Sequence, residues 1–349
     1  MKTVNVANTL IGEGEPCFII AEAGVNHNGD INLAKRLIDV AKEAGADAVK
    51  FQTFKAEEVV TQSAEKAEYQ KETTGAEESQ FQMIKKLELT EEDFEELFAY
   101  ALERGIIFLS SPFDRGSVDL LDGLGLPAFK IPSGEITNFP LLKRIAQKRK
   151  PIILSTGMST LGEIEEALEV IRKEGAEEIA LLHCISSYPA KVEDMNLRAM
   201  EALRYAFDLP VGLSDHTLGI SIPIAAVALG ATIIEKHFTP SRQMTGPDHK
   251  ASLEPGELKY LVECIRNVRV ALGDGIKRPS SCEVPNISVT RRSVFAAIDI
   301  PAGTNVSEQM LKCKRPGTGI SPRYYDQIIG RRAKKDFKAG EILNWDGIL

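Results

Sequence analysis

The stretch IIEKHFTP, residues Ile233 to Pro240, places two isoleucines directly before Glu235, Lys236 and His237. Adjacent β-branched residues are typical of a buried strand, and a strand buried on both faces of a parallel sheet should stay apolar. This one turns polar where it ends. Because the active site of a (β/α)8 barrel lies at the C-terminal ends of its strands, the stretch predicts such a barrel, with its chemistry at this rim.

Seven further β-rich runs precede this strand, and a helical pattern or room for a helix follows each of the eight. Helical periodicity is clear over residues 31–44, from Thr90 to Gly105, and from Thr160 to Gly175. Alternating strands and helices indicate a parallel sheet, and eight units fit a closed barrel better than an open doubly wound sheet. The runs are CFIIAE, DAVKFQ, IIFLSS, AFKIPS, PIILST, IALLHC, PVGLSD and TIIEKH.

The pattern changes after Gly273. Residues 274–286 combine Gly, Pro, Ser and Asn, which is typical of a linker. Residues 287–349 contain short β segments and two similar turns, IPAGTNV and FKAGEIL. We therefore predict a barrel over residues 1–273, a linker over 274–286 and a small β-rich domain over 287–349. The long polar connection from Phe54 to Leu89 is expected to act as a substrate lid.

Composition and charge exclude several classes of protein. The 349 residues are 43% hydrophobic and 26% charged, which is ordinary for a soluble globular chain. We expect no membrane span, because Ser221, Pro223 and Gly230 interrupt the longest apolar run. We expect no signal peptide either, because the N-terminal stretch is interrupted by Gly12, Glu13, Glu15 and Pro16. Five scattered cysteines without a C-x-x-C pair fit a reducing compartment, so we expect a cytoplasmic protein.

The charge is unevenly placed along the chain. Residues 283–349 carry 11 Lys and Arg against 7 Asp and Glu, whereas the first 282 residues carry 31 against 43. An acidic body with a basic tail does not predict a nucleic-acid partner, which needs a broad basic face. It favours docking of the small domain on a barrel, or binding of an anionic ligand.

All five histidines fall at or just after the predicted strand ends, which favours a site there: His27, His183, His216, His237 and His249. His216 and His237 end neighbouring strands, so their side chains can converge on one divalent ion. The alternative, with similar weight, is that the two imidazoles only bind loop backbone.

Two lysines interrupt apolar strands. Lys50 and Lys130 are costly to bury unless an anion matches their charge, which indicates a phosphate or carboxylate ligand. Hydroxyls at Ser111, Ser133 and Ser214 would add donors. Internal salt bridges to Glu22 and Glu135 are one alternative, and a Schiff-base lysine is another. Glu22 and Glu135 are also candidates for acid–base chemistry.

A set of motifs in order resembles the sialic acid synthase family: AEAGVNHNGD, KFQTF, SSPFD, KIPSGEITNFPLL, ILSTGM, GLSDHTLG, EKHFT and GPDHKASLEP. The final stretch, RRSVFAAIDIPAG with KRPGTGISP, resembles that family's antifreeze-like (SAF) domain. The resemblance implies an enzyme that condenses phosphoenolpyruvate with an N-acylated mannosamine and water, releasing phosphate. It also implies a domain-swapped homodimer, in which the SAF domain of one chain covers the barrel of the other.

The resemblance also implies roles for individual residues. It implies that His216 and His237 bind a metal ion, with Mn²⁺ preferred and Mg²⁺ or Co²⁺ as alternatives. Proton handling falls to Glu22, with Glu135 in the same pocket. The residues implied for phosphoenolpyruvate are Lys50, Ser111, Lys130, Ser133, Ser186 and Ser214. Those implied for the sugar are Gln52, Tyr188, Asp248 and Arg315 of the partner subunit.

The expected sugar is N-acetylmannosamine, which would give N-acetylneuraminate. The main alternative is 2,4-diacetamido-2,4,6-trideoxymannose, which would give a legionaminic acid. A Schiff-base aldolase using Lys50 or Lys130 is a more remote hypothesis. A carbohydrate- or ice-binding protein is the least favoured, because KCKRPGTG and GRRAKKD make the tail too charged.

Overall fold

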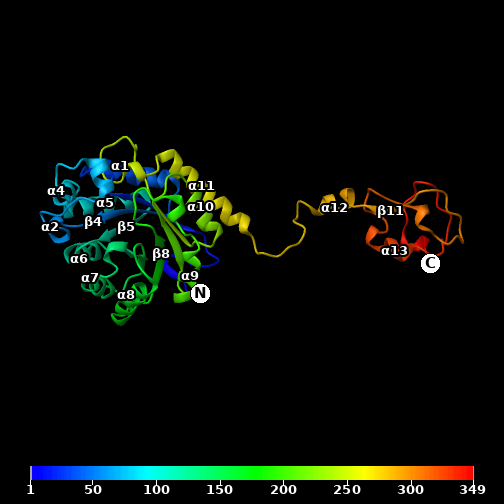
Figure 1. Cartoon of the computed structure of the whole chain (residues 1–349), viewed down its shortest axis with the longest axis horizontal. Coiled ribbons are helices and arrows are strands. Elements are labelled where there is room, and N and C mark those ends of the chain that lie inside the picture. Colours follow the sequence, from blue (N-terminus) through cyan, green and yellow to red (C-terminus); the bar gives the residue numbers. More distant parts are fainter. Residues whose placement is uncertain (1, 349) are drawn as a thin grey trace. The chain divides into compact units, whose positions relative to one another are not determined.

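The computed structural model describes residues 2–348 and divides into two compact units, Met1–Gly273 and Asp274–Leu349. The first unit is built on eight parallel strands with helices around them (Figure 1). The strands are β3 (Phe18–Gly24), β4 (Ala48–Thr53), β5 (Ile107–Pro112), β6 (Phe129–Ile131), β7 (Ile152–Ser155), β8 (Ile179–Cys184), β9 (Val211–Asp215) and β10 (Ile233–His237).

The sheet follows the order β5-β4-β3-β10-β9-β8-β7-β6, and β5 contacts β6 across the remaining seam. Strands consecutive in sequence are therefore neighbours, and β10 returns to pair with β3. The prediction of a (β/α)8 barrel is confirmed, and all eight predicted runs form its strands.

Helices follow the strands and pack their apolar sides on the barrel. They are α1 (Ile31–Ala44), α5 (Glu91–Arg104), α6 (Arg115–Gly123), α7 (Phe139–Ala146), α8 (Leu161–Lys173), α9 (Ala199–Phe207), α10 (Ser221–Ala228) and α11 (Pro255–Leu272). Local sequence sets their ends. Thr90 and Thr160 form capping boxes with Asp93 and Glu163, and Gly45 ends α1 in the left-handed conformation.

The barrel interior has an apolar layer below a polar one. An N-terminal hairpin, β1 (Val4–Val6) and β2 (Thr9–Ile11), joins the apolar layer, which contains Phe18, Ile20, Ala48, Leu109, Ala128, Ile153, Ala180, Leu182 and Ile233. Side chains alternate along a strand, so the residue two positions on faces the same way. That next layer is Glu22, Lys50, Ser111, Lys130, Ser155, Cys184, Ser214 and Glu235.

The connection after β4 is folded rather than irregular. It forms three short helices, α2 (Ala56–Val59), α3 (Glu68–Thr74) and α4 (Gln80–Lys85). Single 3-10 turns lie at Ser133–Glu135, Val192–Asp194 and His249–Ala251. No helix within residues 2–348 is both long and apolar enough to cross a membrane.

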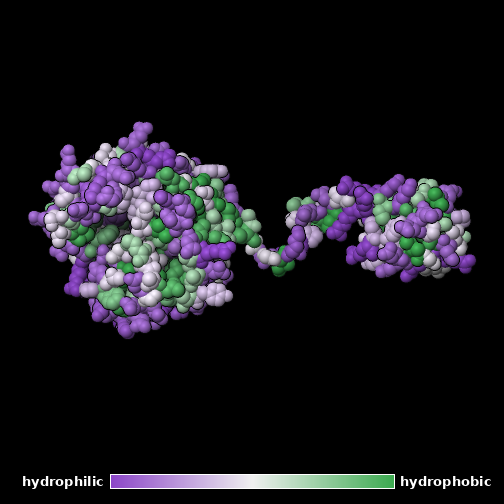
Figure 2. Space-filling view, viewed as in Figure 1, coloured by the Kyte–Doolittle hydropathy of each residue, from purple (hydrophilic) through white to green (hydrophobic). Residues whose placement is uncertain are grey.

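The second unit has its own apolar core, which includes Val294, Ile300, Leu311, Phe337 and Leu343. Its mostly hydrophilic surface is visible in Figure 2. Its strands β11 (Ser293–Ala296) and β12 (Leu311–Lys314) pair antiparallel, and isolated bridges such as Ile300 with Phe337 extend the β structure. Its helices are α12 (Val284–Thr290) and α13 (Tyr325–Ile328), with 3-10 turns at Glu308–Met310, Pro322–Tyr324 and Trp345–Gly347.

Candidate active site

A cavity of about 450 Å³ lies at the C-terminal ends of the barrel strands. Figure 2 shows a hollow on the face of the first unit in view. The cavity brings together most of the side chains that the sequence singled out: Glu22, Lys50, Gln52, Ser111, Lys130, Ser133, Ser186, Tyr188, Ser214, His216, His237 and Asp248. Their individual roles remain predictions.

Two lysines and two carboxylates form a buried cluster on the cavity floor. Lys50 Nζ lies 2.7 Å from Glu22 Oε2 and 3.7 Å from Glu235 Oε2, and Lys130 Nζ lies 3.3 Å from Glu235 Oε1. Lys50 also donates to Ser111 Oγ at 3.1 Å. Since Glu235 sits between the two lysines, it fixes both ammonium groups at the edge of the cavity.

The two carboxylates have opposite pKa shifts. Burial raises the pKa of Glu22 to about 7, although the Lys50 ammonium opposes the shift. Burial also favours the protonated form of Glu235, but Lys130 and Lys50 together outweigh it and lower the Glu235 pKa to about 2. Ser214 Oγ donates to Glu235 Oε1 at 2.9 Å and supports the ionised form. Glu235 is therefore a fixed anion near neutral pH, whereas Glu22 can exchange a proton.

The imidazoles of His216 and His237 lie side by side, with ring centroids 5.3 Å apart. His216 Nδ1 lies 2.7 Å from the carbonyl of Ile185; when it donates there, the lone pair of Nε2 is free. His237 Nδ1 is buried without a hydrogen-bond partner among the described residues, and its nearest carboxylate oxygen is Asp248 Oδ2 at 3.9 Å. Because this imidazole nitrogen lies at the cavity wall and has no partner, it can bind a ligand in the cavity.

The donor set is small. Within residues 2–348 there is no group of three or more His, Cys, Asp or Glu side chains placed to hold a metal ion. Two imidazoles fit a divalent ion only if water or substrate oxygens complete its coordination. Burial lowers the pKa of His237 well below its ordinary value, which keeps the ring neutral as a ligand must be.

Aromatic side chains cover the histidines. The Tyr188 ring lies 4.0 Å from that of His216 and meets the His237 ring edge-on at 5.7 Å. Tyr69, from α3, stacks on Tyr188 at 5.1 Å. The α2–α4 connection therefore supplies part of the cavity wall, and the sequence did not indicate which of its residues do so.

Glu135 was expected in the same pocket, but it is not among the residues that line the cavity, and its catalytic role stays a prediction. Strand β6 ends at Ile131, and the 3-10 turn that follows directs Glu135 to Asn138, whose Nδ2 donates to Glu135 Oε2 at 2.6 Å. The partner of Lys130 is Glu235 instead. A signal for Glu235 was present, because residues two apart on a strand share a face and His237 was already a candidate. Arg315 lies exposed in the second unit, and its role remains a prediction.

Buried lysines, carboxylates and imidazoles at the C-terminal rim of a (β/α)8 barrel define a barrel enzyme with a site suited to an anionic substrate. The chain belongs to the NeuB family, which matches residues 37–277, and a SAF domain matches residues 291–349. The resemblance to sialic acid synthases is thereby confirmed.

The similarity to known proteins extends over almost the whole chain. An N,N′-diacetyllegionaminic acid synthase from Campylobacter jejuni is 56% identical over 93% of this chain and 98% of its own length. Another, from Legionella pneumophila, is 49% identical over 97% and 96%. The crystal structure of a sialic acid synthetase from Leptospira borgpetersenii, in complex with citrate, is 38% identical, with a TM-score of 0.72 over 82% of this chain and 95% of that chain.

Proposed function

We propose that the protein condenses phosphoenolpyruvate with 2,4-diacetamido-2,4,6-trideoxymannose and water to give N,N′-diacetyllegionaminic acid and phosphate. The observation that carries the choice of sugar is the 56% and 49% identity to two proteins named for that product. The sialic acid synthetase is only 38% identical. The comparisons therefore favour the alternative sugar over N-acetylmannosamine.

Phosphoenolpyruvate is expected on the lysine side of the cavity. Lys50 and Lys130 supply buried positive charge, and the hydroxyls of Ser111, Ser133 and Ser214 line the same space. Both lysines are already held by carboxylates, so little rearrangement is needed when the anion enters. Orientation of the enol methylene toward the sugar aldehyde is the main contribution of these residues.

His216 and His237 would hold a divalent ion, with Mn²⁺ preferred and Mg²⁺ or Co²⁺ as alternatives. The unpaired Nδ1 of His237 and the backbone contact of His216 Nδ1 support this assignment. When bound, the ion supplies Lewis-acid chemistry at the aldehyde oxygen of the open-chain sugar.

The remaining chemistry forms a C–C bond and a C–O bond to water, and it breaks the C–O bond to phosphate. The methylene carbon of phosphoenolpyruvate attacks the aldehyde carbon, and water adds to the positive enol carbon that results. Glu22 accepts a proton from this water, for which its raised pKa is suited. The alkoxide left from the aldehyde takes up the proton that Glu22 holds. The tetrahedral intermediate then loses phosphate by cleavage of its C–O bond, the proton of its hydroxyl leaves with the phosphate, and the 2-keto acid remains.

The proposal includes a cytoplasmic location and a domain-swapped homodimer in which Arg315 of the partner subunit contacts the sugar. The basic character of residues 283–349 and the acidic character of the remainder support such docking. Light scattering after size exclusion tests the dimer, which a monomeric active protein would contradict.

Phosphate release from phosphoenolpyruvate tests the reaction. Release is expected only when the diacetamido sugar and Mn²⁺ are both present, and EDTA should abolish it. Release without any sugar would instead indicate a phosphatase.

A further inference from the structure

One side of the cavity is apolar, in contrast to its charged floor. Phe54 and Phe113 meet edge to face with ring centroids 6.2 Å apart, and both pack in one hydrophobic cluster with Val25 and Leu87. The apolar residues that line this side of the cavity are called the apolar wall: Val25, Phe54, Met83, Ile84, Leu87 and Phe113.

The wall is formed outside the strands. Val25 directly follows β3, Phe113 directly follows β5, and the other four members belong to the α2–α4 connection. A wall built on such a connection has a defined shape only if the connection is held in place.

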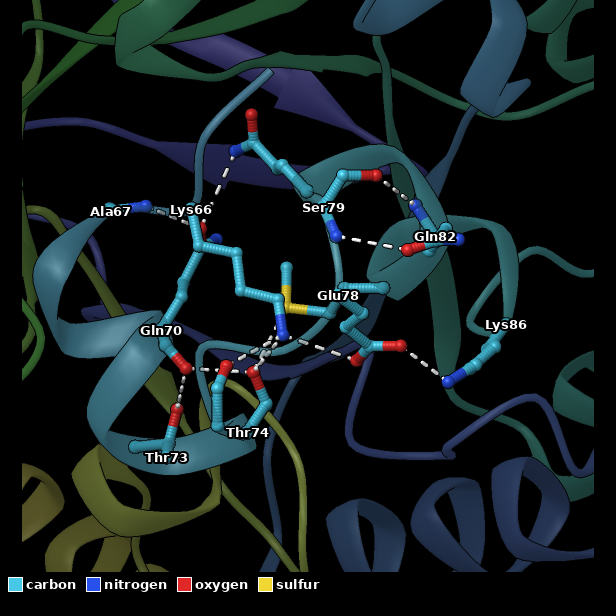
Figure 3. A network of polar contacts seen from close by, with 12 residues as sticks. Lys66, Ala67, Gln70, Thr73, Thr74, Glu78, Ser79, Gln82 and Lys86 are labelled. Atoms are coloured by element: carbon cyan, nitrogen blue, oxygen red, sulfur yellow. Dashed lines mark hydrogen bonds and ion pairs between the residues drawn. The ribbon is translucent and has the colours of Figure 1, made fainter. Parts of the chain in front are cut away.

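A buried lysine holds the connection (Figure 3). The side chain of Lys66 is 1% exposed, and its Nζ donates to Thr74 Oγ1 at 2.9 Å, to the Gly75 carbonyl at 2.9 Å and to Glu78 Oε1 at 3.1 Å. Thr74 Oγ1 in turn lies 3.5 Å from Met83 Sδ. The network ties the end of α3 to the segment that carries Met83, so it supports the part of the wall that Met83 forms.

Amide groups lie beside the wall. Gln52, Gln70 and Gln80 line the same cavity, and Gln52 Nε2 donates to Glu22 Oε1 at 3.3 Å. Apolar side chains next to amides suit a ligand that carries methyl groups and acylamino groups together. A sugar hydroxyl placed against the wall would lose its hydrogen bonds to water without replacement.

We infer that the apolar wall determines sugar specificity by binding methyl groups that 2,4-diacetamido-2,4,6-trideoxymannose has and N-acetylmannosamine lacks. These are the methyl group at C6 and the methyl group of the C4 acetamido substituent. The inference rests on the proposed function and adds to it the residues that select the substrate.

A series of three sugars distinguishes the effect of one methyl group from that of the other: N-acetylmannosamine, 2-acetamido-2,6-dideoxymannose and 2,4-diacetamido-2,4,6-trideoxymannose. The first step of this series replaces the C6 hydroxymethyl group with a methyl group, and the second replaces the C4 hydroxyl with an acetamido group. The experiment measures kcat/KM for phosphate release with each sugar in the wild type and in the variants Val25→Thr and Met83→Gln. Both variants nearly preserve side-chain volume while making the wall polar.

The wild type should show rising kcat/KM along the series. In both variants the ratio of kcat/KM for the diacetamido sugar to kcat/KM for N-acetylmannosamine should fall about tenfold. This is about the factor in kcat/KM that one methyl group contributes in an apolar pocket. The step of the series at which the ratio falls identifies the methyl group bound. Val59→Thr is the matched control, because Val59 packs against the same cluster but does not line the cavity.

Equal losses with all three sugars would overturn the inference, because the wall would then be structural. So would the same change of ratio in Val59→Thr. If the wall variants release phosphate with the same ratio of kcat/KM values as the wild type, this inference is contradicted and the proposed function stays intact. Absence of release with every sugar in the wild type contradicts the proposed function, and the inference with it.

Discussion

Lys236 Nζ lies 2.5 Å from Asp215 Oδ2, and both side chains are almost fully buried. Each residue directly precedes one of the two cavity histidines, and alternation along the strands directs the pair away from the cavity. Asp215 also accepts hydrogen bonds from the backbone and the hydroxyl of Thr217, both at 3.0 Å. The ion pair therefore ties β9 to β10 at the point where His216 and His237 project inward.

Breaking this pair should destabilise the barrel. Lys236→Met leaves Asp215 buried without its partner, which we expect to reduce the free energy of unfolding by about 3–5 kcal/mol. The double variant Asp215→Asn/Lys236→Met should lose less than Lys236→Met alone, because no uncompensated charge remains. Urea unfolding followed by circular dichroism measures both. A loss below about 1 kcal/mol in Lys236→Met would show that the pair does not stabilise the fold.

His237 is expected to be essential for metal binding. His237→Ala should abolish Mn²⁺ binding measured by isothermal titration calorimetry, together with metal-dependent phosphate release, while circular dichroism stays unchanged. His183→Gln is the control, because His183 Nε2 contacts the Met195 carbonyl and does not line the cavity. Wild-type Mn²⁺ affinity in His237→Ala would remove His237 from the metal site.

Glu235 and Glu135 provide a matched comparison. Glu235→Gln removes the anion between Lys50 and Lys130, so the two ammonium groups repel and shift, and kcat/KM for phosphoenolpyruvate should fall roughly 100-fold. Glu135→Gln should change it less than about twofold, because Glu135 lies outside the cavity. Steady-state kinetics with saturating sugar measures both. Similar losses in the two variants would contradict the geometry of the site.

The proton transfer assigned to Glu22 predicts a pH dependence. A base acts only when ionised, and the Glu22 pKa is raised to about 7. The value of kcat/KM should therefore rise as pH increases toward and through about 7, and level off above it. Glu22→Gln should remove this rise along with most of the activity. An unchanged pH profile in that variant would assign the base to another group.

The proposed metal-dependent mechanism forms no imine between a lysine and the substrate. Borohydride added with both substrates should therefore leave the mass of the protein and its activity unchanged. A covalent adduct at Lys50 or Lys130 would support the Schiff-base aldolase instead.

Much of the barrel was predictable because local chemistry determines it. Apolar β-branched runs gave the eight strands, and capping residues such as Thr90 and Thr160 marked helix starts. The polar residues at strand ends gave most of the cavity, because alternation along a strand is a local rule.

The remaining features depend on where a strand ends and on contacts distant in sequence. Glu135 was misplaced because β6 stops at Ile131 and a 3-10 turn redirects the chain. The link between Lys130 and Glu235 joins residues 105 positions apart in sequence. The contacts of Lys66 with Thr74 and Glu78 link the end of α3 to the start of α4, and neither periodicity nor composition indicates them.

The most direct test of the proposed function is a competition between the two sugars. Equal concentrations of 2,4-diacetamido-2,4,6-trideoxymannose and N-acetylmannosamine are incubated with Mn²⁺, the protein and limiting phosphoenolpyruvate, and mass spectrometry gives the ratio of products. That ratio equals the ratio of the two kcat/KM values. We predict that N,N′-diacetyllegionaminic acid predominates, whereas a predominance of N-acetylneuraminate, or neither product, would contradict the proposed function.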